Sequence, residues 1–379
     1  MVKQRFLALD VMRGLTLALM ILVNTPGSWE YVYSPLLHAD WHGVTATDFV
    51  FPFFLFIVGS SMYFSVRGLV QCTRMQQATK ILRRVALLFV IGVLLAAYPF
   101  TQPLHEWRIM GVLQRIALAY GAAAFIILYL GFTARMLLGA FMLLSYWALI
   151  ASFGSDPLSL ENNLVRHWDL ILLGENHLWQ GKGVAFDPEG VLSTLPAVVN
   201  VLVGFEATRV LLGAQTKSAV TANSRQGKAS LSTFTVLAMT GFLMIASGLL
   251  WHPLFPMNKS LWTSSFVLLT SGAAILFLLV LLRLERSPAP LLQRVVNPVY
   301  LACAIMGKNP LFIYVLSFLW ATTLYVVTIG GQSAYDYLYQ CFRAYANPYL
   351  ASLLFALMQV ALFWLVAWVL HKRDIIISL

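Results

Sequence analysis

Apolar runs of membrane-spanning length recur along the whole chain and constrain its fold more than any other feature. About 20 helical residues, each rising about 1.5 Å, cross the apolar core of a bilayer. Hydropathy predicts such segments at residues 7–25, 46–66, 82–99, 111–130, 135–152, 192–212, 232–250, 263–282, 309–329 and 350–370. They leave no stretch large enough for a separate soluble domain. We therefore expect an all-α fold, a polytopic transmembrane helical bundle of about ten spans that forms one domain over residues 1–379.

Charged side chains are scarce and unevenly placed. They make up 11% of the residues, against roughly 25% in soluble domains, while 60% of the residues are hydrophobic. Most Lys and Arg residues flank the predicted spans on the side of the two termini, which predicts cytoplasmic N- and C-termini. These basic residues beside the predicted spans account for the net charge of +10, as expected for a protein in membrane lipid. The basic residues form no nucleic-acid-binding pattern, so we expect no nucleic-acid partner.

The cysteines and the long loops further constrain how the chain is organised. Cys72, Cys303 and Cys341 lie far apart, outside any spacing typical of a zinc site or a disulfide framework. The long loop 153–191, expected on the periplasmic side, contains a stretch at 160–174 that predicts an interfacial helix. Residues 213–230 are rich in small and polar residues and predict a flexible cytoplasmic loop. No internal repeat is evident, which disfavours an inverted-repeat transporter.

The densest polar cluster surrounds the first predicted external loop. Asn24 ends the first span, His38 lies in the loop, and Asp48 begins the second span. Because the loop is short, the three side chains can converge at the mouth of one cavity. An imidazole beside a carboxylate is suited to remove a proton from an amine or hydroxyl, or to accept an acyl group on its nitrogen. The alternatives are a hydrogen-bonded interfacial histidine and an N-cap role for Asp48.

His42 follows His38 by four residues within HADWHG (38–43). On a helix this spacing would suit a pair of metal ligands. Trp41 and the glycine after His42 argue against a helix at this point, so we expect no metal.

Arg115 falls inside the fourth predicted span, next to Gln114. A buried guanidinium needs an anion or several carbonyl groups as partners. Two interpretations remain open at this point. One is a salt bridge with Asp48 or Glu106, and the other is a contact with a carbonyl or phosphate of a ligand.

Two carboxylates, Asp187 and Glu189, lie in the external sequence FDPEG (186–190), downstream of Trp179. Carboxylates beside an indole offer the charged hydrogen bonds and the stacking surface that an amino sugar or polyol needs. The same sequence is also typical of a turn that leads into a helix.

Two further polar pairs lie at the starts of later spans. Asn258 and Lys259 precede the eighth span on the external side, and Lys308 and Asn309 precede the ninth on the cytoplasmic side. Lys308 is therefore on the side where a nucleotide phosphate would arrive.

Several motifs follow one another along the chain: RFLALDVMRGLTLALMILVN (5–24), HADWHGVTATDFVFPFFLFIVGSSM (38–62), GVLQRIALAY (111–120), FDPEGVLSTLP (186–196), FPMNKSLWTSSF (255–266) and GKNPLFIY (307–314). Together they resemble the heparan-alpha-glucosaminide N-acetyltransferase family over nearly the whole chain. The chain is similar to a bacterial member with the membrane catalytic domain alone, without the luminal N-terminal segment and extra span of the animal lysosomal enzyme.

The resemblance implies transfer of acetyl from cytoplasmic acetyl-CoA, a cosubstrate, to a sugar on the far side of the membrane. For a bacterial inner membrane we expect a periplasmic amino sugar, glucosamine or N-acetylglucosamine, or an envelope glycan, with N- or O-acetylation both open. The family's active-site histidine falls on His38, and its companion asparagine and aspartate fall on Asn24 and Asp48. Its buried arginine falls on Arg115, which implies a contact with CoA. His42 replaces an asparagine of the animal enzyme and implies a second base or another acceptor preference.

From the residues and the resemblance together we expect the following arrangement. The nucleotide binds near Lys308, Asn309, Arg83 and Arg84, and the pantetheine arm threads between helices to His38. Asn24 or Arg115 polarises the thioester carbonyl. Direct attack and transfer through acetyl-His38 both remain open. The acceptor is expected to meet Trp41, His42, Trp179, Asp187, Glu189, Asn258 and Lys259.

Other readings of the same features remain. A transporter or flippase for an envelope sugar or peptide would also need a polar cavity and a long external loop. A structural subunit would use the polar residues for helix packing alone. Family resemblance and the frequency of two-fold symmetry favour a homodimer.

Overall fold

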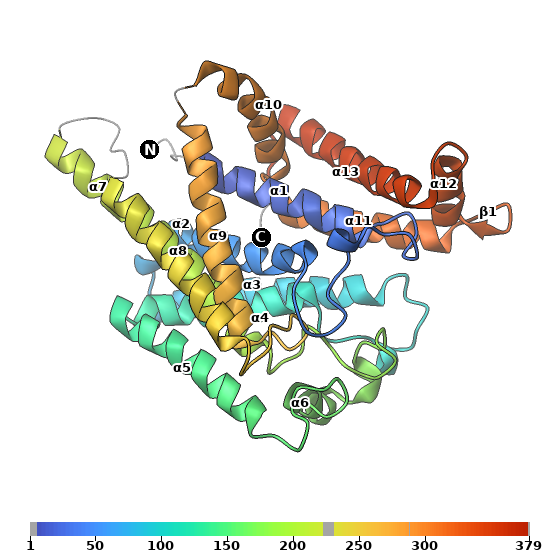
Figure 1. The fold of residues 1–379 in the computed structure, drawn as a ribbon, viewed down its shortest axis with the longest axis horizontal. Coiled ribbons are helices and arrows are strands. Elements are labelled where there is room, and N and C mark those ends of the chain that lie inside the picture. The colour runs from blue at the N-terminus through green and yellow to red at the C-terminus, as the bar shows by residue number, and fades with distance from the viewer. Residues whose placement is uncertain (1–5, 223–230, 288, 378–379) are drawn as a thin grey trace.

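The computed structural model describes residues 6–222, 231–287 and 289–377, and this part of the chain is an all-α bundle (Figure 1). Its α-helices are α1 (Leu7–Asn24), α2 (Val50–Val70), α3 (Arg74–Ala97), α4 (Val112–Tyr129), α5 (Phe132–Ala151), α6 (Leu164–Leu173), α7 (Thr194–Ala222), α8 (Leu231–Trp251), α9 (Ser264–Glu285), α10 (Pro290–Met306), α11 (Pro310–Val326), α12 (Ala334–Arg343) and α13 (Pro348–Lys372). Short 3₁₀ helices are η1 (Ser34–Leu36), η2 (Ala46–Phe49), η3 (Leu104–Glu106) and η4 (Glu175–His177). Strands β1 (Thr328–Ile329) and β2 (Gln332–Ser333) form an antiparallel hairpin.

Eight helices of the described part are long and apolar enough to cross a membrane. The number is nine if the stretch from Gln293 to Val326, bent by 76° between α10 and α11, counts as one span. The expected polytopic helical bundle is thereby confirmed, and the chain is a multi-pass membrane protein. The span expected at 82–99 lies in α3, whose 24 residues are long enough to cross but carry several basic side chains in the first half.

The connecting segments hold more helix than hydropathy predicts. A helix is present within the stretch 160–174 as α6, which begins where the Asn163 side chain accepts a hydrogen bond from the Arg166 N–H at 2.8 Å. The stretch before the ninth expected span, taken as a loop from the sequence, instead contains α10. The loop expected at 213–230 overlaps the end of α7, and its part from 223 to 230 lies outside the described residues.

Helices α2 and α7 lie in backbone contact at the centre of the bundle. A Cβ at Gly59 would lie 1.8 Å from the Val201 carbonyl oxygen, and one at Gly204 would lie 1.9 Å from that of Phe56. Only glycine allows this approach on both sides. The contact fixes α2, which directly follows Asp48, against α7, which follows the FDPEG sequence (186–190).

Both ends of the described chain lie at one end of the bundle, which we call the inner end. Here Arg13 of α1 donates to the Gly307 carbonyl at 3.2 Å, and Lys308 Nζ lies 2.8 Å from His371 Nδ1 near the end of α13. From this end α1, α11 and α13 run beside one another (Figure 1). The opposite, outer end is formed by the loops 25–49, 98–111, 152–193 and 252–263, which contact one another, for example through Lys182 Nζ and the Asp40 carbonyl at 2.6 Å.

Candidate active site

A cavity of about 550 Å³ opens at the outer end between α1, α2, α4 and α11. This volume lies in the range of roughly 300–1,000 Å³ that is typical of small-molecule sites. Its apolar walls reach Met20, Phe51 and Tyr314 in the interior of the bundle. The polar or charged lining residues include Asn24, His38, Thr47, Asp48, Arg108, Lys182, Glu189, Lys259 and Ser317.

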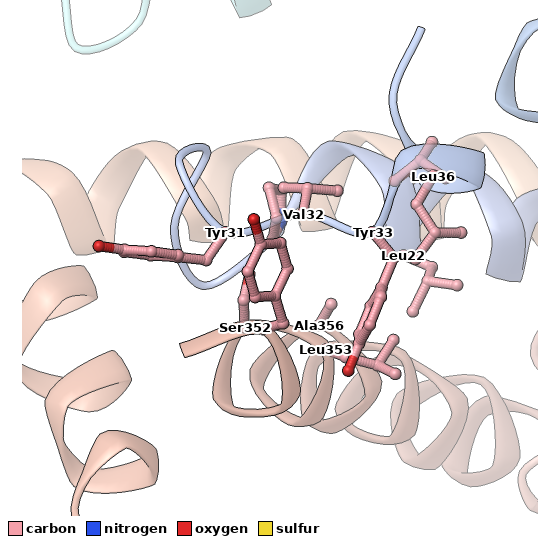
Figure 2. A pocket seen from close by; sticks show the side chains of 11 residues that line it. Leu22, Tyr31, Val32, Tyr33, Leu36, Ser352, Leu353 and Ala356 are labelled. Atoms are coloured by element: carbon pink, nitrogen blue, oxygen red, sulfur yellow. The ribbon is translucent and has the colours of Figure 1, made fainter. Parts of the chain in front are cut away.

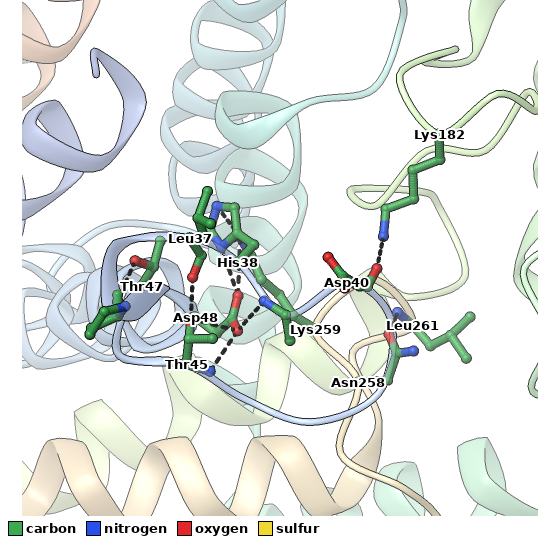
Figure 3. Close-up of polar contacts among 12 residues, drawn as sticks. Leu37, His38, Asp40, Thr45, Thr47, Asp48, Lys182, Asn258, Lys259 and Leu261 are labelled. Carbon is green, nitrogen blue, oxygen red and sulfur yellow. Dashed lines mark hydrogen bonds and ion pairs between the residues drawn. The ribbon is translucent and has the colours of Figure 1, made fainter. Parts of the chain in front are cut away.

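His38 and Asp48 meet at the mouth of this cavity, as the sequence predicts (Figure 3). His38 Nδ1 lies 2.7 Å from Asp48 Oδ1. The Asp48 side chain is fully buried, whereas that of His38 is 44% exposed. Because an ionised carboxylate only accepts hydrogen bonds, this pairing assigns the proton to Nδ1 and leaves the Nε2 lone pair available as a base.

The other oxygen of Asp48 organises the loop. Asp48 Oδ2 accepts hydrogen bonds from the backbone N–H groups of Ala39 and Thr45, at 3.1 and 2.9 Å. Thr45 and Asp48 form a capping box at the start of η2, which continues into α2. Asp48 is therefore not an N-cap, since Thr45 caps η2 and Phe49 precedes α2. One of its oxygens completes the capping box from the third helical position, and the other pairs with the imidazole.

Lys259 brings a basic side chain to His38, although 221 residues separate the two in the chain. Its Nζ lies 3.0 Å from His38 Nε2, 3.1 Å from Nδ1 and 3.9 Å from Asp48 Oδ1. A nitrogen equally close to both ring nitrogens cannot lie in the ring plane without overlapping Cε1, so Nζ lies over the face of the imidazole. Burial lowers the pKa of Lys259, an effect that the nearby carboxylates of Asp48 and Glu189 oppose.

Lys259 projects from a tightly bonded turn. The Asn258 side chain accepts from the Leu261 N–H at 2.8 Å, and the Asn258 N–H donates to Thr263 Oγ1 at 3.0 Å. Trp262 has a φ of 53°, in the left-handed region that bulky residues avoid at a cost of about 1–3 kcal/mol. It is held there by its Nε1–H bond to Asn200 Oδ1 at 3.0 Å.

Arg115 lies beneath this turn and not on the cavity. It is fully buried, its Cζ lies 4.7 Å from the centre of the Trp262 ring, and its Nη2 donates to Ser193 Oγ and to the Gly190 carbonyl. The salt bridge considered for Arg115 is therefore wrong for the described residues, since its partners are a hydroxyl, a carbonyl and an indole. Arg115 connects the FDPEG loop to the Lys259 turn.

Arg108 organises the two carboxylates of the FDPEG loop. It donates to Asp187 through Nε and Nη2, both at 2.8 Å, and to Glu189 Oε2 at 2.7 Å. Burial raises the pKa of Asp187, whereas for Glu189 the positive charges of Arg108, Arg115 and Lys259 outweigh burial and lower its pKa. Glu189 therefore faces the cavity as an anion, while Asp187 is fully buried behind it.

The remaining expected acceptor residues divide into two groups. Trp41 and Trp179 line the cavity, with the Arg108 Cζ 5.9 Å from the Trp179 ring centre. Trp41 is anchored by its Nε1–H bond to the Leu158 carbonyl at 2.7 Å. Asn258 and His42 are not among the described lining residues, and they pair with each other, Nδ2 to Nδ1, at 3.5 Å.

The residues expected to meet the nucleotide are not part of this cavity either. Lys308 lies beside His371, and the Asn309 side chain donates to the Ile375 carbonyl at 3.0 Å. Arg83 and Arg84 lie on α3, where the Arg84 Cζ stacks 4.7 Å from the Tyr120 ring centre. Lys308 precedes the lining residue Tyr314 by six residues, about 9 Å along a helix.

Arg108, Lys182 and Tyr314 are among the lining residues that the sequence analysis did not predict. Arg108 carried a usable signal, because it directly precedes the fourth predicted span on the same side as the FDPEG carboxylates. Lys182 and Tyr314 carried none, since their place at the cavity depends on how distant loops and helices pack.

A second hollow lies between α1, the loop 26–36 and α13, beside Tyr31, Tyr33 and Tyr349 (Figure 2). Its volume is about 10 Å³, which is the space of one water molecule. It is therefore too small for a sugar, and the cavity at His38 is the candidate active site.

The fold and this site define a multi-pass membrane protein with an aspartate-oriented histidine at the outer mouth of a ligand-sized cavity. A family model described as heparan-alpha-glucosaminide N-acetyltransferase, catalytic, matches residues 5–244, and the chain belongs to this family. Its sequence is 29% identical to heparan-alpha-glucosaminide N-acetyltransferase of Mus musculus, with 73% of this chain and 49% of the mouse protein covered. The protein of that name in Homo sapiens is 28% identical, with 73% and 48% covered. The chain thus spans about half the length of the curated relatives it matches.

Proposed function

We propose that the protein is a transmembrane acetyltransferase that moves acetyl from cytoplasmic acetyl-CoA to a periplasmic amino sugar of the glucosamine or N-acetylglucosamine type. The name of the matched family and the names of the mouse and human relatives support the reaction class. The observation that carries the proposal is the His38–Asp48 pair at the mouth of a cavity that extends into the bundle. We place the protein in a bacterial inner membrane, as a homodimer.

In the reaction, the acceptor nitrogen or oxygen attacks the carbonyl carbon of the thioester. His38 Nε2 removes the proton of the attacking group, and Asp48 stabilises the imidazolium that results. The carbon–sulfur bond then breaks, and the thiolate of CoA takes the proton from His38. A route through acetyl-His38 uses the same atoms, with Nε2 as the first nucleophile.

The substrates are proposed to approach from opposite ends. Glu189, kept anionic by Arg108, binds hydroxyl or ammonium groups of the sugar, and Trp179 and Trp41 offer ring faces for it. The nucleotide of acetyl-CoA binds at the inner end near Lys308, Asn309, Arg83 and Arg84, and its pantetheine arm reaches His38 past Tyr314.

The test is a transfer assay with the purified protein, acetyl-CoA and a panel of amino sugars, in which released CoA and acetylated sugar are measured by mass spectrometry. We expect the change His38→Ala to lower turnover by roughly 10²–10⁴-fold, the range typical of a general base. His105→Ala, at an exposed histidine of the outer end that pairs with Glu106, is the matched control. Near-normal turnover of the His38 variant would overturn the mechanism. Uptake of labelled sugar into liposomes without acetyl-CoA would instead support a transporter.

A further inference from the structure

The proposed reaction needs a positive group that the mechanism above has not supplied. When the thioester carbonyl is attacked, its oxygen becomes an oxyanion, and fixed donors or cations at that position lower the barrier. Arg115 is poorly placed for this task, because it is fully buried beneath the Trp262 ring and is not among the described lining residues.

Lys259 lies beside the proposed base. Its Nζ lines the cavity 3.0 Å from His38 Nε2, on the face of the ring. Nε2 keeps its in-plane lone pair for the proton of the acceptor, so the ammonium and the base do not compete for one direction. The carbonyl that reacts beside Nε2 lies within reach of the same ammonium.

The backbone that carries Lys259 is held rigidly. Asn258 bonds the Leu261 N–H, Trp262 is fixed in a left-handed conformation, and Arg115 stacks on the Trp262 ring. Strained backbone of this kind clusters at functional sites, where the surroundings hold it in place. Because the turn is already fixed, the charge needs little reorganisation during the reaction.

We propose that Lys259 is a catalytic residue of the acetyl transfer proposed above, on which this inference rests, and that its ammonium stabilises the oxyanion. The acceptor lone pair forms the new bond to the carbonyl carbon, and the carbonyl π electrons move to the oxygen beside Nζ. When these electrons return, the carbon–sulfur bond breaks and CoA leaves with the proton that His38 had taken. Lys259 keeps all its protons, and Arg115 is a positioning residue that acts through the turn.

Burial lowers the pKa of Lys259, and the carboxylates of Asp48 and Glu189 oppose this effect by favouring the protonated amine.

The experiment compares Lys259→Met, Lys259→Arg and Lys182→Met in the transfer assay, with the wild type and His38→Ala alongside. Lys182 is a matched control, because it is a lysine of the same cavity mouth whose Nζ bonds the Asp40 carbonyl and lies over Trp41. We expect Lys259→Met to lower kcat by roughly 10²–10³-fold with little change in KM for the sugar. Lys259→Arg should recover part of this loss, and Lys182→Met should lose less than about tenfold, far below the loss of an oxyanion donor.

The outcomes separate this inference from the proposed function. A higher KM for the sugar with unchanged kcat in Lys259→Met would assign Lys259 to acceptor binding and overturn the catalytic role. Equal losses in Lys259→Met and Lys182→Met would overturn it as well. An inactive wild type, or a fully active His38→Ala variant, would count against the acetyltransferase itself. If Lys259→Met does not fold, restoration of Lys259→Ala by added ethylammonium supports the role, and no restoration in folded Lys259→Ala contradicts it.

Discussion

The two ends of the bundle both carry buried or half-buried polar groups, but those groups face different surroundings. At the outer end His38, Asp48 and Lys259 lie around a cavity that is open to a ligand. At the inner end Arg13 pairs with Asp10 at 2.8 Å, and the side chains there face one another. Polar groups that point into a cavity are available for chemistry, whereas mutually paired groups mainly fix helix ends.

The inner end is also the more tightly closed of the two. A Cβ at Gly307 would lie 2.1 Å from the Asp10 carbonyl oxygen, so the break between α10 and α11 lies directly on α1. The Asn309 side chain holds the following tail by donating to the Ile375 carbonyl and accepting from the Ile377 N–H at 2.7 Å. The difference places the open, ligand-sized cavity at the outer end and the mutually paired groups at the inner end. In the proposed function, acetyl-CoA would have to enter past these paired groups.

The largest effect that separates the ends is expected from Asp48→Asn. An amide keeps an oxygen for the capping box but removes the charge that orients and stabilises the His38 ring, so kcat should fall roughly 10²–10⁴-fold. Steady-state kinetics measure the loss, with Asp40→Asn in the same loop as the matched control. An Asp48 variant as active as this control would remove the distinction between a reactive outer end and a structural inner one.

A smaller effect of a different kind is expected from Lys308→Met at the inner end. Loss of one charged contact with a phosphate should raise the KM for acetyl-CoA about tenfold and leave kcat nearly unchanged. Lys372→Met, which removes a lysine stacked on Trp368 at the same end, is the control. Should kcat fall while KM stays constant, the inner end would take part in chemistry and the comparison would fail.

An effect on stability, not on turnover, concerns the pH dependence of unfolding at the outer end. Burial raises the pKa of Asp169 in α6 from 3.8 to about 7, so the folded protein keeps this proton where the unfolded chain releases it. The free energy of unfolding should therefore fall as pH rises from about 4 to 7 and level off above 7, by at most roughly 1.4 kcal/mol per pKa unit.

Thermal unfolding in detergent at several pH values measures this slope, and Asp169→Asn should flatten it. Asp156→Asn, in the same outer loop, should leave the slope as in the wild type. A slope that persists unchanged in Asp169→Asn would show that another group carries it.

Much of the fold was predictable because hydropathy is a local property. Each of the ten expected spans corresponds to a helix, from α1 to α13. Helix α10 was missed because Arg294 and the helix-internal Pro298 lower its apolar character. In the folded chain α10 packs against α9, where the Tyr300 hydroxyl donates a hydrogen bond to the Leu281 carbonyl at 2.7 Å. Such tertiary contacts cannot be read from a local stretch of sequence.

The site divides in the same way. His38 and Asp48 were predictable as neighbours because only ten residues separate them and the loop is short. Lys259 was expected to bind substrate, but its place on the His38 ring depends on α9 packing beside α2, which sequence spacing does not reveal. Arg115 illustrates the converse, since its burial was evident while its partners, Trp262 and Ser193, come from distant loops.

The most direct test of the account uses sealed proteoliposomes with glucosamine trapped inside and acetyl-CoA added outside. Wild-type protein should produce N-acetylglucosamine inside the vesicles, whereas His38→Ala vesicles should produce it at least about a hundredfold more slowly. Product that forms only when both substrates are on the same side of the membrane would contradict transfer from the inner end to His38.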